Sequence, residues 1–138
     1  MITAQGILEE LLESLTTKRD TSIIRRDRSE NLQRQAVAEG NPWADSWNST
    51  IHTAQLKADL CASILNDLFS FINLGYNPEE TVQKVLDNTE GLIDRILESS
   101  RASIVAVTYH VKCEQSVLKE YLRRLKIIKE HQMIRISY

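Results

Sequence analysis

The fold class follows from residues 51–74, which read IHTAQLKADLCASILNDLFSFINL. Apolar residues recur here with the alternating steps of three and four that mark one helix face, at Ile51, Ala54, Ala58, Cys61, Leu65, Leu68 and Ile72. A second stripe lies beside the first, at Leu56, Leu60, Ile64 and Phe71. A helix with so wide an apolar arc must be covered from two directions, so we expect it at the centre of the molecule.

The composition is that of a globular helical chain. Its 138 residues are 42% hydrophobic and 26% charged, which excludes a disordered protein and suffices for one domain with its own core. With only four Gly and two Pro, the chain should have few turns and long uninterrupted elements. We therefore predict an all-α fold with a single helical domain over residues 1–138, a bundle of four to five helices built on a central antiparallel hairpin.

The N-terminal part is expected to hold two helices. The first, over residues 3–16, carries a narrow apolar stripe at Ile7, Leu8, Leu11, Leu12 and Leu15. The second, over residues 21–38, is poorly patterned and is interpreted as mostly solvated. The sequence Gly40-Asn41-Pro42 ends it, because Gly accepts a left-handed cap and Pro disfavours helix in the residue before it.

The boundary after the central helix is marked by Gly75 and by Asn77-Pro78-Glu79-Glu80. Asn77 is a good N-cap, Pro78 suits the first helical position, and Glu80 has the spacing of a capping-box partner. The following helix, to about Glu98, is joined to the central one by about three residues. The two should form an antiparallel hairpin.

Residues 99–111 admit two interpretations. Val105, Val107, Tyr109 and Val111 alternate as in a strand, whereas a helical spacing runs from Ile104 to the end of the chain. We favour the helix because an isolated strand finds no partner elsewhere. The last, long C-terminal helix is then expected over residues 103–131, after a break near residues 99–102. Without a break, the fused helix would be ~80 Å long and would imply an extended or intertwined dimer.

Localisation signals are absent from the sequence as given. The start of the chain shows no signal-peptide pattern, and no apolar run approaches the ~20 residues of a membrane span. Cys61 and Cys113 have no close pair, which is typical of a reduced compartment. We expect a cytoplasmic or otherwise intracellular protein without a membrane partner.

Metal chemistry has weak support. His110 and Cys113 lie three residues apart, and His52 and Cys61 lie on the central helix. Together they have the residue types of a Cys2His2 zinc site. The spacing matches no compact zinc motif, and such Cys are usually core residues. We therefore expect no metal and no cofactor.

Acidic residues form a stripe on the fourth helix, at Asp87, Glu90, Asp94 and Glu98. Such a stripe binds Mg²⁺ when a second acidic helix faces it. Glu10 and Glu13 resemble the ExxE half of the all-helical nucleotide pyrophosphohydrolases, but no matching ExxD occurs. The stripe is interpreted as a solvated face.

One enzyme alternative rests on Arg124 and His131, an Arg and a His separated by six residues near the end of a helical chain. This spacing resembles the motif of the HEPN ribonucleases, all-helical domains in which Arg and His of two protomers meet and cleave RNA without a metal. The resemblance covers eight residues and implies that Arg124 and His131 are catalytic. Leu125 departs from it, because the family tends to have a polar residue there.

A second alternative is nucleic-acid binding. Residues 112–138 hold seven basic and three acidic groups, whereas residues 1–111 hold ten and sixteen. The candidate phosphate contacts are Lys112, Lys119, Arg123, Arg124, Lys126 and Lys129. The acidic total and the scarcity of interleaved aromatics favour instead a solvated helix face.

The leading prediction is a non-enzymatic helical interaction or assembly protein. Trp43 and Trp47, four residues apart, either close one end of the bundle or form an anchor for a protein partner. The apolar stripes exceed what the expected helices need to cover one another. We therefore expect self-association, most simply as a symmetric homodimer.

Overall fold

The structure is a computed structural model that describes residues 2–99 and 102–137, with side chains described as far as His131. The described residues form four α-helices, one short 3-10 helix and no strand: α1 (Ala4–Ala38), η1 (Ala44–Trp47), α2 (Asn48–Asn73), α3 (Pro78–Ser99) and α4 (Ile104–Ser137). The predicted all-α class and the long C-terminal helix are confirmed.

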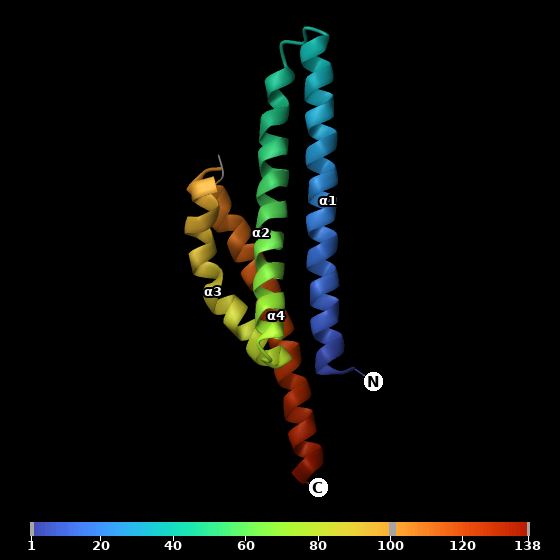
Figure 1. Ribbon diagram of the computed structural model, residues 1–138, viewed down its shortest axis with the longest axis vertical. Coiled ribbons are helices and arrows are strands. Elements are labelled where there is room, and N and C mark those ends of the chain that lie inside the picture. The colour runs from blue at the N-terminus through green and yellow to red at the C-terminus, as the bar shows by residue number, and fades with distance from the viewer. Residues whose placement is uncertain (1, 100–101, 138) are drawn as a thin grey trace.

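Two helical hairpins make up the bundle (Figure 1). α1 and α2 form the longer, antiparallel one, and α3 turns back along α2 before α4 crosses behind it. We call the part of the long hairpin made by residues 22–55 the tip; the base is the rest of α1 and α2 with α3 and α4. α2 packs on α1 and on α3, which confirms the prediction that it is covered from two directions.

The large buried side chains gather in the base. One apolar cluster draws on all four α-helices and includes Leu8, Leu11, Ile64, Leu68, Val85, Leu92, Val107 and Leu118. Fully burying a Leu, Ile or Val side chain contributes roughly 1.5–3 kcal/mol, so this cluster supplies most of the driving force for folding. The C-terminal end of α4 continues beyond it (Figure 1).

The prediction of two N-terminal helices is wrong, because α1 runs without a break from Ala4 to Ala38. Residues 17–20 contain neither Gly nor Pro, so nothing in the backbone ends the helix there. The buried face continues beyond them at seven-residue intervals, at Leu8, Leu15, Ser22, Ser29 and Ala36. Small and polar residues occupy its second half, which a search for apolar residues does not detect.

The end of α1 and the start of α3 follow the local signals in the sequence. Gly40, just after α1, has φ of 70° and takes the left-handed conformation that glycine allows. At α3, the Glu80 backbone N–H donates to Asn77 Oδ1 at 2.8 Å, and Asn77 Nδ2 donates to Glu80 Oε1 at 2.9 Å. Asn77 is thus the predicted cap, with its side-chain amide held by Glu80.

The ambiguous segment is helical where it is described. α4 begins at Ile104, and the Ala106 backbone N–H donates to Ser103 Oγ at 3.2 Å, as at an N-cap. The strand alternative is therefore wrong for residues 104–111. The expected break is confirmed by the separate ends of α3 at Ser99 and α4 at Ile104, although residues 100 and 101 lie outside the described ones.

Candidate functional surfaces

The two Trp side chains differ in exposure. Trp43 precedes η1 and is 75% exposed, whereas Trp47 at its end is half-buried. Trp43 is therefore the more exposed of the two. Its role as a partner anchor stays a prediction.

Arg124 and His131, the pair that resembles the HEPN motif, have different surroundings. Arg124 donates from Nη1 and Nη2 to the two carboxylate oxygens of Glu10 on α1, at 3.1 and 3.0 Å. This ion pair raises the pKa of Arg124 and lowers that of Glu10, in each case mainly through the hydrogen bonds. His131 lies exposed farther along α4. Arg124 therefore links two helices, and the ribonuclease alternative stays a prediction.

The six basic candidates of α4 fall into two groups. Arg124 pairs with Glu10, and Lys129 Nζ lies 3.4 Å from Glu79 Oε2. The others are exposed along one face of the helix, at Lys112, Lys119, Arg123 and Lys126. Arg123 pairs with Glu120 of its own helix, which leaves three lysines at seven-residue spacing with no ion pair to any side chain described.

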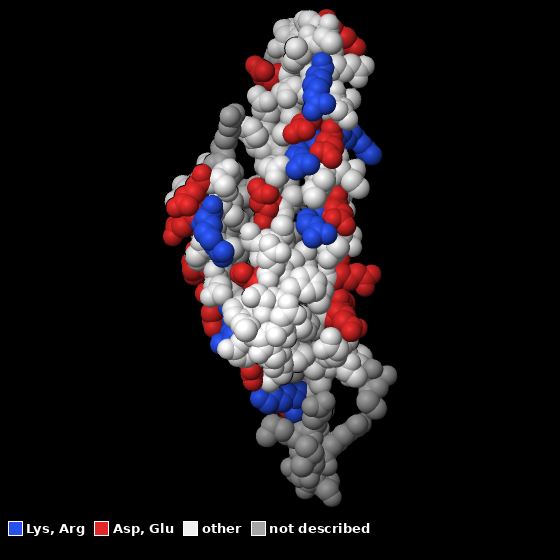
Figure 2. All heavy atoms as spheres, viewed as in Figure 1, with Lys and Arg blue, Asp and Glu red and all other residues white. Residues whose placement is uncertain are grey.

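The residues considered for metals do not assemble a site. Cys61, His110 and Cys113 all line one cavity between α1, α2 and α4, but His52 does not. Among the described residues, no group of three or more His, Cys, Asp or Glu is placed to hold a metal ion. The four acidic residues of the α3 stripe are exposed, and red atoms follow the outer side of that helix in Figure 2.

A surface that the sequence reasoning missed lies on α2 and on the turn that follows it. Between Leu60 and Asn77 the only charged residue is Asp67, and its side chain is directed to α3, where Arg95 Nη2 lies 3.9 Å from its Oδ2. The remaining exposed side chains over the base half of α2 carry no charge. Figure 2 shows this area as a broad white face.

The residues of the charge-free face form a regular stripe along α2. Ala62, Asn66, Phe69 and Asn73 follow one another at steps of four, three and four, so they form a single stripe along α2. Phe69 lies in this stripe and is 48% exposed. Ser63 and Ser70 flank it, and the exposed Leu74 extends it into the turn. The Tyr76 ring marks its edge, because Lys84 Nζ lies over that ring, 4.6 Å from the centroid. The signal available in the sequence was the long run without charges.

Comparisons with known proteins add nothing to this geometry. Searches against protein-family models, curated proteins and solved structures found no match. The structure itself adds one finding about membranes: no helix in residues 2–99 or 102–137 has both the length and the apolar character that a bilayer crossing requires.

Proposed function

We propose that this chain is a non-enzymatic assembly protein that forms a two-fold homodimer through the charge-free face of α2. The observation that carries the proposal is the stripe of Ala62, Asn66, Phe69 and Asn73, which leaves a large aromatic ring half-exposed among uncharged side chains of α2. Burying such a ring contributes substantially to association.

A two-fold contact places the same surface of both copies face to face, so the surface must complement itself. Charged residues on such a face would bring like charges together across the axis. This face avoids that repulsion because Asp67 is directed to α3. The side-chain amides of Asn66 and Asn73 both donate and accept hydrogen bonds, so each is able to pair with an amide of the second copy.

The size of the face sets the expected strength of the dimer. Stable interfaces use roughly 20–30 residues on each side. The stripe, its flanking serines and the apolar turn supply fewer than that. We therefore expect a reversible dimer whose population rises with protein concentration.

The test is sedimentation velocity over a range from micromolar to near-millimolar concentration. Wild type is expected to shift from monomer to dimer, and Phe69→Lys should remain monomeric because it places two like charges near the axis. Leu32→Lys, at an exposed apolar residue of the tip, is the matched control and should dimerise as wild type does. A wild-type chain that stays monomeric, or equal loss in both variants, contradicts the proposal.

Nucleic-acid binding is a second candidate, favoured by the regular row of Lys112, Lys119 and Lys126. Residues seven apart on a helix are separated by about 10.5 Å along its axis, and these side chains have no ion pairs to the described residues. Contacts between three lysines and phosphates release counterions, so affinity for duplex DNA would fall steeply with salt. Lys119→Glu should remove that salt-dependent binding; binding that is independent of salt contradicts this candidate.

A further inference from the structure

A cavity of about 670 Å³ lies where α4 meets the junction between the tip and the base. Its walls come from three helices: Thr21 and Arg25 from α1, Thr53 and Lys57 from α2, and His110 from α4. The cavity has the volume of a small-molecule site, which is typically about 300–1,000 Å³. It is separate from the charge-free face of α2.

One side of the cavity is closed by an ion pair. Lys18 Nζ on α1 lies 3.5 Å from Glu114 Oε2 on α4, and the Glu114 carboxylate is mostly shielded from solvent. This pair joins the two walls and cancels its own charge. Glu114 is the only acidic residue that lines the cavity among the residues described.

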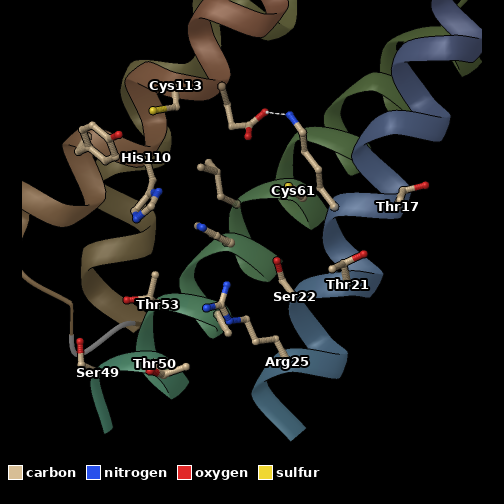
Figure 3. A pocket seen from close by; sticks show the side chains of 16 residues that line it. Thr17, Thr21, Ser22, Arg25, Ser49, Thr50, Thr53, Cys61, His110 and Cys113 are labelled. Atoms are coloured by element: carbon tan, nitrogen blue, oxygen red, sulfur yellow. Dashed lines mark hydrogen bonds and ion pairs between the residues drawn. The ribbon is translucent and has the colours of Figure 1, made fainter. Parts of the chain in front are cut away.

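Two cations of the cavity have no ion pair with the described side chains. Arg25 and Lys57 line the cavity and form no ion pair with any described side chain. In Figure 3 the Arg25 side chain extends from α1 into the space between the helices, and the His110 ring enters it from α4. The cavity therefore presents a net positive charge to whatever enters it.

The wall also offers hydroxyl donors and apolar area. Thr21, Ser22 and Thr53 line the same cavity as the two cations, and the exposed Tyr109 ring supplies uncharged surface. A phosphoryl group has three terminal oxygens that accept hydrogen bonds, one more than a carboxylate has. Arg, Lys and hydroxyl groups together supply enough hydrogen-bond donors for three oxygens. The apolar area suits an organic group attached to the phosphoryl group.

We propose that this cavity binds a phosphorylated small molecule, with Arg25 and Lys57 holding the phosphoryl group. The Arg25 guanidinium offers paired N–H donors to two of its oxygens, and the Lys57 ammonium supplies a point charge. The organic part of the molecule lies against Tyr109.

The pKa of His110 can report whether a ligand occupies the cavity. The pKa of His110 is lowered, first by burial and then by the positive charge of Lys57, while Glu114 opposes the shift. Several ionisable groups line the same cavity from all three helices: Lys18, Arg25, Lys57, Cys61, Cys113 and Glu114. A bound phosphoryl group offsets the charge of Lys57, so it should raise the pKa of His110.

The probe is phenyl phosphate, titrated by calorimetry into the full chain, with phenol and inorganic phosphate as comparisons. Wild type should bind phenyl phosphate more tightly than either comparison. Lys57→Met should raise the dissociation constant about tenfold or more, because a charge-assisted hydrogen bond is lost. Lys112→Met is the matched control, since Lys112 is an exposed lysine of α4 outside the cavity, and should bind as wild type does.

An NMR titration of the His110 ring against pH, with and without phenyl phosphate, locates the ligand. The expected result is an upward shift of its pKa on binding. The proposal is overturned if wild type does not bind phenyl phosphate, if phenol binds equally well, if the two Met variants weaken binding alike, or if the pKa of His110 does not move.

Discussion

The base and the tip of the long hairpin are stabilised by different kinds of contact. In the base, Leu11, Ile64 and Leu68 are completely buried among four helices. In the tip, α1 buries only Ser22, Ser29 and Ala36, and the buried residues of α2 there are Ile51 and Ala54. The same pair of helices thus passes from a large apolar core to a contact in which the buried residues of α1 are all small.

The tip compensates with directed polar contacts. Arg26 Nη1 donates to Gln55 Oε1 at 2.8 Å, and Gln33 Nε2 donates both to Asn48 Oδ1 at 2.6 Å and to the Ala44 carbonyl oxygen at 3.2 Å. Each such bond contributes only about 0.5–1.5 kcal/mol net, which is less than a buried Leu or Ile contributes. The comparison teaches that stability is unequal along the hairpin, and that the tip should open before the base.

The largest expected effect is a cavity in the base. Ile64→Ala removes a completely buried side chain from the core and should lower the free energy of unfolding by about 2–5 kcal/mol. Leu32→Ala in the tip removes a partly exposed side chain and should cost under about 1 kcal/mol. Urea unfolding followed by circular dichroism measures both. Equal losses would show that the two regions are not energetically distinct.

A smaller effect is expected from overfilling the tip. Ser29→Leu inserts a large side chain at a buried position of α1 where its buried residues are all small, and should cost about 1–3 kcal/mol. Amide hydrogen exchange should show lost protection within residues 22–55 and unchanged protection in the base. Ser29→Ala, which keeps the side chain small, is the control. Loss of protection throughout the chain would mean that the tip and the base unfold as one unit.

The contrast between the two regions also explains which parts of the fold the sequence predicted. α2 and α3 were placed within a few residues because their apolar stripes and the Asn77-Pro78 start are strong local signals. The continuity of α1 was missed because Ser22 and Ser29 are buried without being apolar. Their burial follows from the position of α2, and a tertiary contact of this kind leaves little trace in hydrophobic periodicity.

The candidate surfaces were less predictable than the fold. The spacing of Arg124 and His131 raised a catalytic alternative, which stays a prediction, and the structure adds that Arg124 is held by Glu10. The charge-free face of α2 depends on Asp67 being directed to α3, and the cavity depends on the path of α4 behind the hairpin. The cavity combines residues far apart in sequence, so spacing alone does not find it. The charge-free face lies within residues 61–76, and only the direction of the Asp67 side chain required the structure.

The polar contacts of the tip allow a finer test. Gln33→Ala removes the donor to Asn48 and to Ala44, and should cost about 0.5–1.5 kcal/mol of local stability. Hydrogen exchange at the start of α2 is the measurement. Gln35→Ala, whose side chain reaches only Glu39 one turn away, is the control and should leave that region unchanged. If both variants behave alike, the bonds from Gln33 do not stabilise the tip.

The smallest expected effect lies in the base, at the exposed ion pair between Glu10 and Arg124. The hydrogen bonds from Arg124 lower the pKa of Glu10 below its ordinary value of 4.5, so the folded state holds that proton less tightly than the unfolded state does. The pair therefore stabilises the fold above pH 4.5, and this contribution is lost as the pH falls through the lowered pKa.

Glu10→Gln should accordingly flatten the dependence of stability on pH below that value, while changing unfolding at neutral pH only slightly, because exposed ion pairs contribute little. Urea unfolding at a series of acidic pH values measures the slope. Glu13→Gln, at an exposed residue one turn along α1 with no ion pair to the described side chains, should keep the wild-type slope. An identical slope in wild type and Glu10→Gln would mean that Arg124 does not tie α4 to α1 in solution. Arg124 would then be free for the chemistry that its resemblance to the HEPN motif implies.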